Sequence, residues 1–178
     1  MELIRFAFGL AVGSFIHVVA VRYRPDTFLF RRDMLVGRSA CPRCHTLLQW
    51  FELIPLVSFL IQKGKCRSCS AGMSLHYPAV ELISGFIFLF VPIAIKSHFP
   101  FASFMPLSIL WVSAFLTLLL VALIDSRLTI IPDEANILLA VLGIVIAAET
   151  VSSFTLVDGS FMGSYALLFG FRESIFLN

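Results

Sequence analysis

Long apolar stretches separated by polar connections are the main pattern of this chain. The first stretch, residues 3–21, has about the 20 residues that a helix needs to cross a bilayer. Four more stretches, at residues 79–95, 101–124, 135–148 and 154–171, each predict another membrane-spanning helix. The pattern therefore predicts an all-α fold, a polytopic transmembrane helical bundle of about five spans.

A long polar segment, residues 22–78, interrupts this pattern between the first two spans. It divides the chain into a first transmembrane helix (1–21), the polar segment itself and a transmembrane helical region (79–178). No small-residue cleavage site follows the first span, so we interpret that span as a retained anchor instead of a secretory signal. After the third span, Pro132 is expected to end any helix that continues from it.

Composition and charge agree with a membrane protein. Of the 178 residues, 59% are hydrophobic and 13% are charged, whereas a soluble domain carries about 25% charged residues. Nine of the thirteen lysines and arginines lie between Arg22 and Arg67, and short basic loops stay in the cytoplasm. The polar segment is therefore predicted to be cytoplasmic. Because no helix accompanies these charges that could read nucleic acid, the expected partner is the lipid bilayer and not nucleic acid.

All four cysteines of the chain lie in the polar segment, as two C-x-x-C pairs formed by Cys41 with Cys44 and by Cys66 with Cys69. Twenty-one residues separate the pairs, a spacing typical of two knuckles that share one tetrahedral zinc ion. Such a site has four protein ligands and no open position for water, so its role would be structural. Disulfides or free thiols are the alternatives, and a cytoplasmic location disfavours disulfides. A redox role lacks the βαβ context that such motifs need.

Asp125 is the most informative acidic residue. It follows residues 101–124, none of which is charged, and a carboxylate at the end of a membrane helix is costly to keep there. It is therefore a candidate for a catalytic acid or base. Proton transfer during bond cleavage normally uses two carboxyl groups. A second carboxylate therefore decides what this chain can do.

Seven short motifs follow one another along residues 9–145. They are Gly13-Ser-Phe-Ile-His-Val-Val-Ala-Val-Arg22, Arg38-Ser-Ala-Cys-Pro-Arg-Cys44, Leu53-Ile-Pro55, Gly64-Lys-Cys-Arg-Ser-Cys69, Tyr77-Pro-Ala-Val-Glu81, Ala122-Leu-Ile-Asp125 and Ile131-Pro-Asp133. In this order they resemble the prepilin peptidases, also called type IV leader peptidases. The set is far more specific than any one motif alone.

The resemblance implies an aspartic endopeptidase embedded in the bacterial inner membrane. Such an enzyme cleaves the leader of type IV prepilins or type II secretion pseudopilins at the cytoplasmic face. Many members of the family then methylate the new amino terminus with S-adenosylmethionine. Asp125 matches the first of the family's two catalytic aspartates, which activates water while sharing a proton with its partner.

The sequence also departs from the family pattern. The family's second aspartate lies in a G-x-G-D-x-K motif after the fifth span, and residues 163–178 contain no such motif. We therefore expect a fragment, a truncated homologue or a partner-dependent form. The alternative function is a non-catalytic membrane module that binds pilin-like helices or partner subunits. Asp133 is better explained as a residue in the first turn of the fourth helix than as a catalytic partner, and Glu173 as a solvated tail charge.

Two polar residues inside the spans and one short apolar stretch leave alternatives open. His17, where the family usually has Asn, is more readily explained as a hydrogen-bonded packing residue than as a ligand. Glu81 either contacts a substrate amino terminus or S-adenosylmethionine, or pairs with Arg22 or with His76, which stands where the family usually has Arg. Residues 53–61 are too short to span and pack on the zinc module or on the membrane surface.

Overall fold

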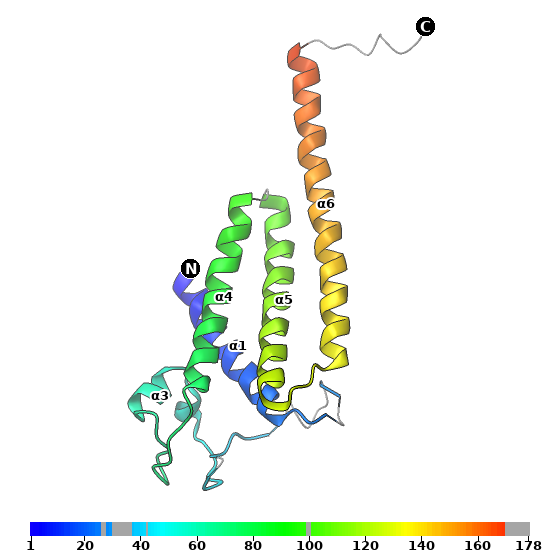
Figure 1. Ribbon diagram of the computed structural model, residues 1–178. Helices are drawn as coiled ribbons and strands as arrows, with labels where there is room; N and C mark the ends of the chain where they lie inside the picture. Colours follow the sequence, from blue (N-terminus) through cyan, green and yellow to red (C-terminus); the bar gives the residue numbers. More distant parts are fainter. Residues whose placement is uncertain (26–27, 30–36, 42, 99–100, 170–178) are drawn as a thin grey trace.

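The computed structural model describes residues 1–25, 28–29, 37–41, 43–98 and 101–169, with side chains for all of these except 98, 101–103 and 153–169. Within this part the regular secondary structure is helical, apart from two isolated β-bridges. The elements are α1 (Glu2–Arg22), the 3-10 helix η1 (Trp50–Leu53), α3 (Val57–Ile61), α4 (His76–His98), α5 (Phe101–Leu128) and α6 (Asp133–Phe169) (Figure 1). The predicted all-α fold class is confirmed.

Four helices of the described chain are long and apolar enough to cross a membrane, where the sequence pattern predicted about five spans. They are Glu2–Arg22, His76–Ser97, Phe104–Leu128 and Asp133–Ser152.

The difference lies in α6. We expected separate spans at 135–148 and 154–171, but one helix continues from Asp133 to Phe169. Between the two stretches, residues 149–153 (Glu-Thr-Val-Ser-Ser) lower the hydropathy but include no proline that would break the helix. Residues 170–171 of the expected fifth span, and Glu173, lie outside the described residues.

The end of α5 is fixed by the backbone, as Pro132 led us to expect. Thr129 adopts the left-handed conformation (φ 53°), and its N–H donates to the carbonyl of Asp125 at 2.8 Å. This arrangement satisfies one of the carbonyls that a helix end leaves without a partner. Pro132 is fully buried, and α6 begins at the next residue, Asp133.

The first and second spans, α1 and α4, approach each other unusually closely. A Cβ atom on Gly9 would lie 2.8 Å from the Cα of Gly85, and one on Gly13 would lie 2.7 Å from the Cβ of Ser84. Lipid tails are as apolar as leucine side chains, so membrane helices associate through close packing at small residues. The two glycines of α1, four residues apart, therefore form the face against which α4 packs.

A second contact region joins the ends of α1 and α5 to the start of α6. Its buried residues are Ile16, Val19, Ala20, Tyr23, Leu29, Leu120, Ile124 and Ala135. The guanidinium of Arg127 also donates a 2.6 Å hydrogen bond to the carbonyl of Ala20. Arg127 therefore satisfies a carbonyl in the last turns of α1 and holds α5 beside it.

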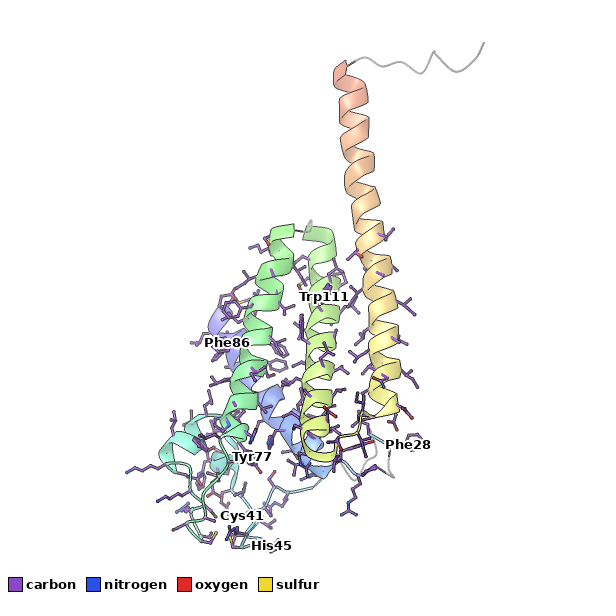
Figure 2. All side chains as sticks on the ribbon, in the orientation of Figure 1. Phe28, Cys41, His45, Tyr77, Phe86 and Trp111 are labelled. Atoms are coloured by element: carbon purple, nitrogen blue, oxygen red, sulfur yellow. The ribbon has the colours of Figure 1, made fainter. Side chains whose placement is uncertain are left out.

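The residues between α1 and α4 form a compact unit at one end of the bundle, which we call the cysteine segment (residues 37–41 and 43–75). It contains η1 and α3, and Figure 1 shows it at the end where α1 ends and α4 begins. Figure 2 places Cys41 and His45 at the outermost part of this unit, beyond the helix ends.

The close contact of α1 with α4 leads to a prediction about stability. Gly13→Ala places a methyl group against Ser84 and against the backbone of Glu81, 3.0 Å from its Cα. We expect overpacking of this kind to cost about 1–3 kcal/mol of unfolding free energy. The measurement is thermal unfolding of the purified protein in detergent.

The matched control is Gly143→Ala in α6, where a Cβ would meet nothing within 4 Å. Replacing a helical glycine by alanine at such a site should be neutral or stabilising by up to about 1 kcal/mol. Equal effects of the two substitutions would contradict the tight α1–α4 contact.

Candidate functional site

The structure brings the four cysteines together at one point of the cysteine segment. Their sulfur atoms all lie within 4.8 Å of one another. The Cys41–Cys69 and Cys44–Cys66 sulfur pairs are each 3.9 Å apart. A tetrahedral metal site with metal–sulfur bonds of about 2.3 Å requires sulfur–sulfur distances of about 3.8 Å. The four thiols are free and can therefore hold one metal ion.

The two halves of this cluster have the same backbone fold. In the first, the N–H of Cys41 donates to the Thr46 carbonyl and the N–H of His45 donates to the Cys41 carbonyl. The second half repeats both hydrogen bonds twenty-five residues later, with Cys66, Ser70 and Ala71. His45 and Ser70 share a left-handed conformation, with φ of 56° and 55°. Each turn thus directs its two sulfur atoms toward the centre of the cluster, as a zinc knuckle does.

The pKa values of the thiols show what this packing does to their charge. The hydroxyl of Thr46 lowers the pKa of the Cys44 thiol to about 6, and the N–H of Cys69 lowers the pKa of Cys66. At Cys69 the N–H of Ala71 acts in the same direction, but desolvation and the neighbouring sulfurs outweigh it and raise the pKa to about 11. Four clustered thiols cannot all ionise cheaply without a cation, and a bound metal ion supplies that charge.

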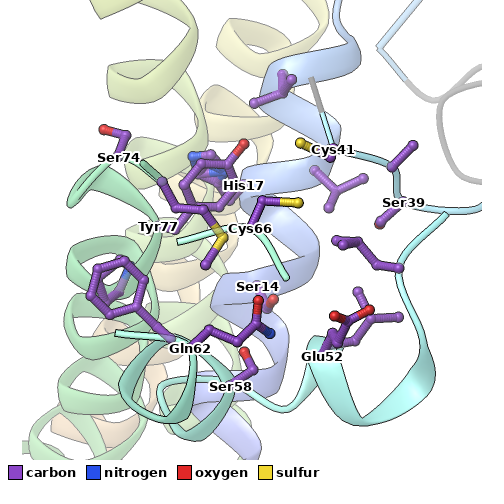
Figure 3. A pocket seen from close by; sticks show the side chains of 18 of the residues that line it. Ser14, His17, Ser39, Cys41, Glu52, Ser58, Gln62, Cys66, Ser74 and Tyr77 are labelled. Carbon is purple, nitrogen blue, oxygen red and sulfur yellow. The ribbon is translucent and has the colours of Figure 1, made fainter. Parts of the chain in front are cut away.

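A cavity of about 450 Å³ lies between the cysteine segment and the adjoining ends of α1 and α4 (Figure 3). Ser14 and His17 of α1, Tyr77 and Glu81 of α4, and Cys41 and Cys66 of the cysteine segment are among the residues that line it. The cysteine segment closes this cavity on the side away from the α1–α4 contact.

Glu81 is the buried charged group of this cavity, with 8% of its surface exposed. Its carboxylate accepts a 2.7 Å hydrogen bond from the N–H of Leu56, and the hydroxyl of Ser14 lies beside it. Of the partners we considered for Glu81, Arg22 donates instead to the carbonyls of Gly37 and Arg38. Glu81 thus ties the second span to the cysteine segment.

His17 is buried and packs against Tyr77, with ring centroids 4.0 Å apart. This agrees with the packing role expected for it. Its Nδ1 atom has no hydrogen-bond partner among the described residues, so the expected hydrogen bond is not made at that atom.

Asp125 lies in the last turn of α5 with an exposed side chain, and Asp133 is the first residue of α6. The first-turn position predicted for Asp133 is therefore confirmed. Asp125 does not line the cavity, although it lies at the same end of the bundle. The structure thus separates the candidate catalytic aspartate from the cysteine cluster, and the contact of Arg127 with α1 holds the α5 end in place.

Sequence reasoning missed the contact between Glu81 and the Leu56 backbone. No local signal could reveal it, because the acceptor and the donor are twenty-five residues apart and the donor is a backbone group. The left-handed φ of 59° at Leu56 shows that this turn is held against its intrinsic preference.

These features define a class of protein, a multi-pass helical membrane protein with a four-cysteine insertion between its first two spans. A sequence profile of the bacterial peptidase A24 N-terminal domain matches residues 7–95, half of the chain. The chain belongs to this peptidase family, which confirms the resemblance to prepilin peptidases.

Curated relatives agree with this family membership. Over 152 residues the chain is 35% identical to a prepilin leader peptidase/N-methyltransferase of Bacillus subtilis, covering 84% of this chain and 54% of that protein. It is 45% identical over 83 residues to the protein of that name from Myxococcus xanthus, covering 47% of this chain and 23% of the relative. A Pseudomonas aeruginosa relative of the same name is 31% identical over 175 residues, covering 88% and 57%.

The chain therefore spans about half the length, or less, of the curated relatives it matches. No solved structure matches it significantly.

The tie between Glu81 and Leu56 can be tested by substitution. Glu81→Leu leaves the half-buried Leu56 N–H without its acceptor, at a cost of about 1 kcal/mol. We expect faster tryptic cleavage after Lys63, Lys65 and Arg67 in the cysteine segment. Glu81→Gln keeps a carbonyl oxygen for Leu56 and should leave the digestion close to that of the unaltered protein. Equal digestion of both variants would show that this hydrogen bond does not hold the segment.

Proposed function

We propose that this chain is the part of a prepilin peptidase that carries Asp125, an aspartic endopeptidase acting on the leaders of type IV prepilins or pseudopilins. The observation that carries the proposal is the family membership, together with an exposed carboxylate at the end of a membrane span. The substrate would approach with its leader in water and its apolar stretch in the lipid. A carboxylate at the level of the membrane surface suits cleavage at that junction.

The topology we propose follows the charge distribution. The basic residues between Arg22 and Arg67 favour a cytoplasmic cysteine segment in the inner membrane. Asp125 would then lie at the cytoplasmic face, because the cysteine segment and the α5 end occupy the same end of the bundle (Figure 1). We keep the division into a first transmembrane helix (1–21), a cytoplasmic segment (22–78) and a helical region (79–178).

In the proposed chemistry, Asp125 acts as a general acid and base. One carboxylate of a pair takes a proton from water while the other carboxyl group, protonated, donates to the carbonyl of the scissile peptide. This chain supplies Asp125 for one of these roles. We assign the second carboxyl group to no residue of this sequence, because Asp133 has a first-turn position at the start of α6 that explains it.

For the four cysteines we propose a structural zinc ion. Four sulfur ligands with near-tetrahedral spacing suit zinc and leave no position for a catalytic water. The ion would join the two knuckles and so hold the cysteine segment over α1 and α4.

Methylation is the second activity we propose, because relatives carry N-methyltransferase in their name. The cavity beside Glu81 is where S-adenosylmethionine would bind, since a buried carboxylate favours a cationic group. When bound, this cofactor supplies an electrophilic methyl group. Glu81 and Ser14 would hold its ammonium or sulfonium charge, and Tyr77 would supply an aromatic face.

The peptidase proposal predicts that Asp125→Asn abolishes processing. Loss of a general acid or base should lower cleavage by at least about 100-fold. The measurement is conversion of a model prepilin, followed by gel mobility, by membranes that contain the protein together with a segment that supplies the second carboxyl group. Asp133→Asn is the matched control and should retain activity.

Two results would contradict this assignment. Unchanged cleavage by Asp125→Asn would remove Asp125 from the site. Binding of the prepilin without any cleavage, when the second carboxyl group is supplied, would favour the non-catalytic binding module.

The zinc proposal predicts about one zinc ion per chain in the purified protein. Cys66→Ser should remove most of the metal, because three ligands hold zinc less tightly than four, whereas Ser68→Ala in the same turn should keep it. Elemental analysis of each variant gives the answer. A folded preparation of the unaltered protein that contains no metal would contradict the proposal.

A further inference from the structure

The part of the cysteine segment between the two cysteine pairs exposes a continuous set of large apolar side chains. We call this set the apolar patch; it consists of Trp50, Phe51, Leu53, Ile54, Val57, Leu60 and Ile61. The most exposed members are Trp50 at 76%, Leu60 at 72% and Ile61 at 75%. An apolar surface of this size facing water would be unfavourable, so the patch indicates contact with another phase or partner.

The depth of the patch along the bundle is set by one hydrogen bond. Leu56, in the turn between η1 and α3, donates to the carboxylate of Glu81 at 2.7 Å. Glu81 lies five residues inside α4, whose span begins at His76, which corresponds to about 7.5 Å along the helix axis. The turn therefore lies level with the first part of a membrane span and not beyond it.

Figure 1 agrees with this placement: α3 lies beside the ends of α1 and α4, whereas the cysteine loops lie farther out. The turn that carries the apolar patch therefore lies level with the start of the α4 span.

The charges next to the patch complement a bilayer surface. Within residues 43–75 the basic residues are Arg43, Lys63, Lys65 and Arg67, and the one acidic residue is Glu52. Lys63, Lys65 and Arg67 follow directly after α3 and are exposed. The guanidinium of Arg67 also lies 5.5 Å from the ring centroid of Phe51, so a basic group borders the apolar patch. Tryptophan with flanking lysine and arginine is the composition of a membrane–water interface.

We infer that η1 and α3 form an interfacial membrane anchor, in which the apolar patch enters the boundary between headgroups and acyl chains. Lys63, Lys65 and Arg67 then meet lipid phosphates. For residues 53–61, the sequence left open packing on the zinc module or on the membrane surface, and this inference selects the membrane surface. The anchor fixes the cysteine segment flat against the membrane and holds the cavity at the depth of the bilayer surface. It does not depend on the peptidase activity or on the metal.

The chain has two tryptophans, which allows a direct test. In Trp111→Phe, Trp50 is the single emitter, and in Trp50→Phe it is Trp111, which lies within the α5 span. Each variant is reconstituted as the full chain in vesicles of phosphatidylcholine and phosphatidylglycerol. We expect Trp50 emission to be blue-shifted, to lose intensity when the lipids carry bromine on acyl carbons near the headgroup, and to respond weakly to aqueous iodide. Trp111 reports the response of a residue inside a span.

A second variant tests the patch itself. Leu60→Lys with Ile61→Lys, made in the Trp111→Phe background, places two charges on the patch. Trp50 emission should then shift to the red and its quenching by brominated lipid should fall. The matched control is Leu47→Lys, which changes an exposed apolar residue in the first cysteine loop. This control should leave both signals unchanged, and an unchanged thermal unfolding transition would show that each variant is folded.

The inference is overturned if iodide quenches Trp50 strongly while brominated lipid does not, because the segment would then lie in water. It is equally overturned if neither quencher acts, because the patch would then be covered by protein, such as a second copy of the chain.

Discussion

The close packing of α1 against α4 is the constraint on which the rest of this structure depends. In a bilayer there is little hydrophobic driving force between helices, so their association relies on the backbone approach that Gly9, Gly13 and Gly85 permit. This contact sets the register between the two helices. As a result, Ser14 and His17 of α1 line the same cavity as Tyr77 and Glu81 of α4. The cavity and the attachment of the cysteine segment follow from that register.

The cysteine segment is held at several independent points, which explains how a unit with so little regular secondary structure keeps a defined position. Its two knuckles share one hydrogen-bond pattern and converge on a single cluster of sulfurs. The turn at Leu56 is bound to Glu81 of the second span. Arg22, at the end of the first span, reaches the carbonyls of Gly37 and Arg38. Such a unit can line a cavity because these contacts fix its position against the first two spans.

Two chemically distinct regions thus share one end of the bundle. The Asp125 region is built from the ends of α5 and α6, and the cavity region from α1, α4 and the cysteine segment. One hydrogen bond joins the two regions. Arg127 of α5, two residues after Asp125, donates it to the carbonyl of Ala20 in α1. In the function that we propose, a substrate lying along the membrane surface would meet both regions without leaving that surface. This arrangement suits a family whose relatives are named for both cleavage and methylation.

The sequence alone determined the helical membrane class, the four metal-binding candidates and the place of Asp125 at the end of a span. These properties follow from composition, from spacing within a few residues and from the length of apolar stretches, all of which are local. Only the tertiary structure decided that residues 135–148 and 154–169 belong to one helix, and that Glu81 binds the Leu56 backbone and so draws the turn between η1 and α3 to the start of α4. The physical reason is that these features depend either on contacts between residues far apart in the sequence or on a small difference in free energy between a continuous and a broken helix. Neither leaves a periodic signal in the sequence.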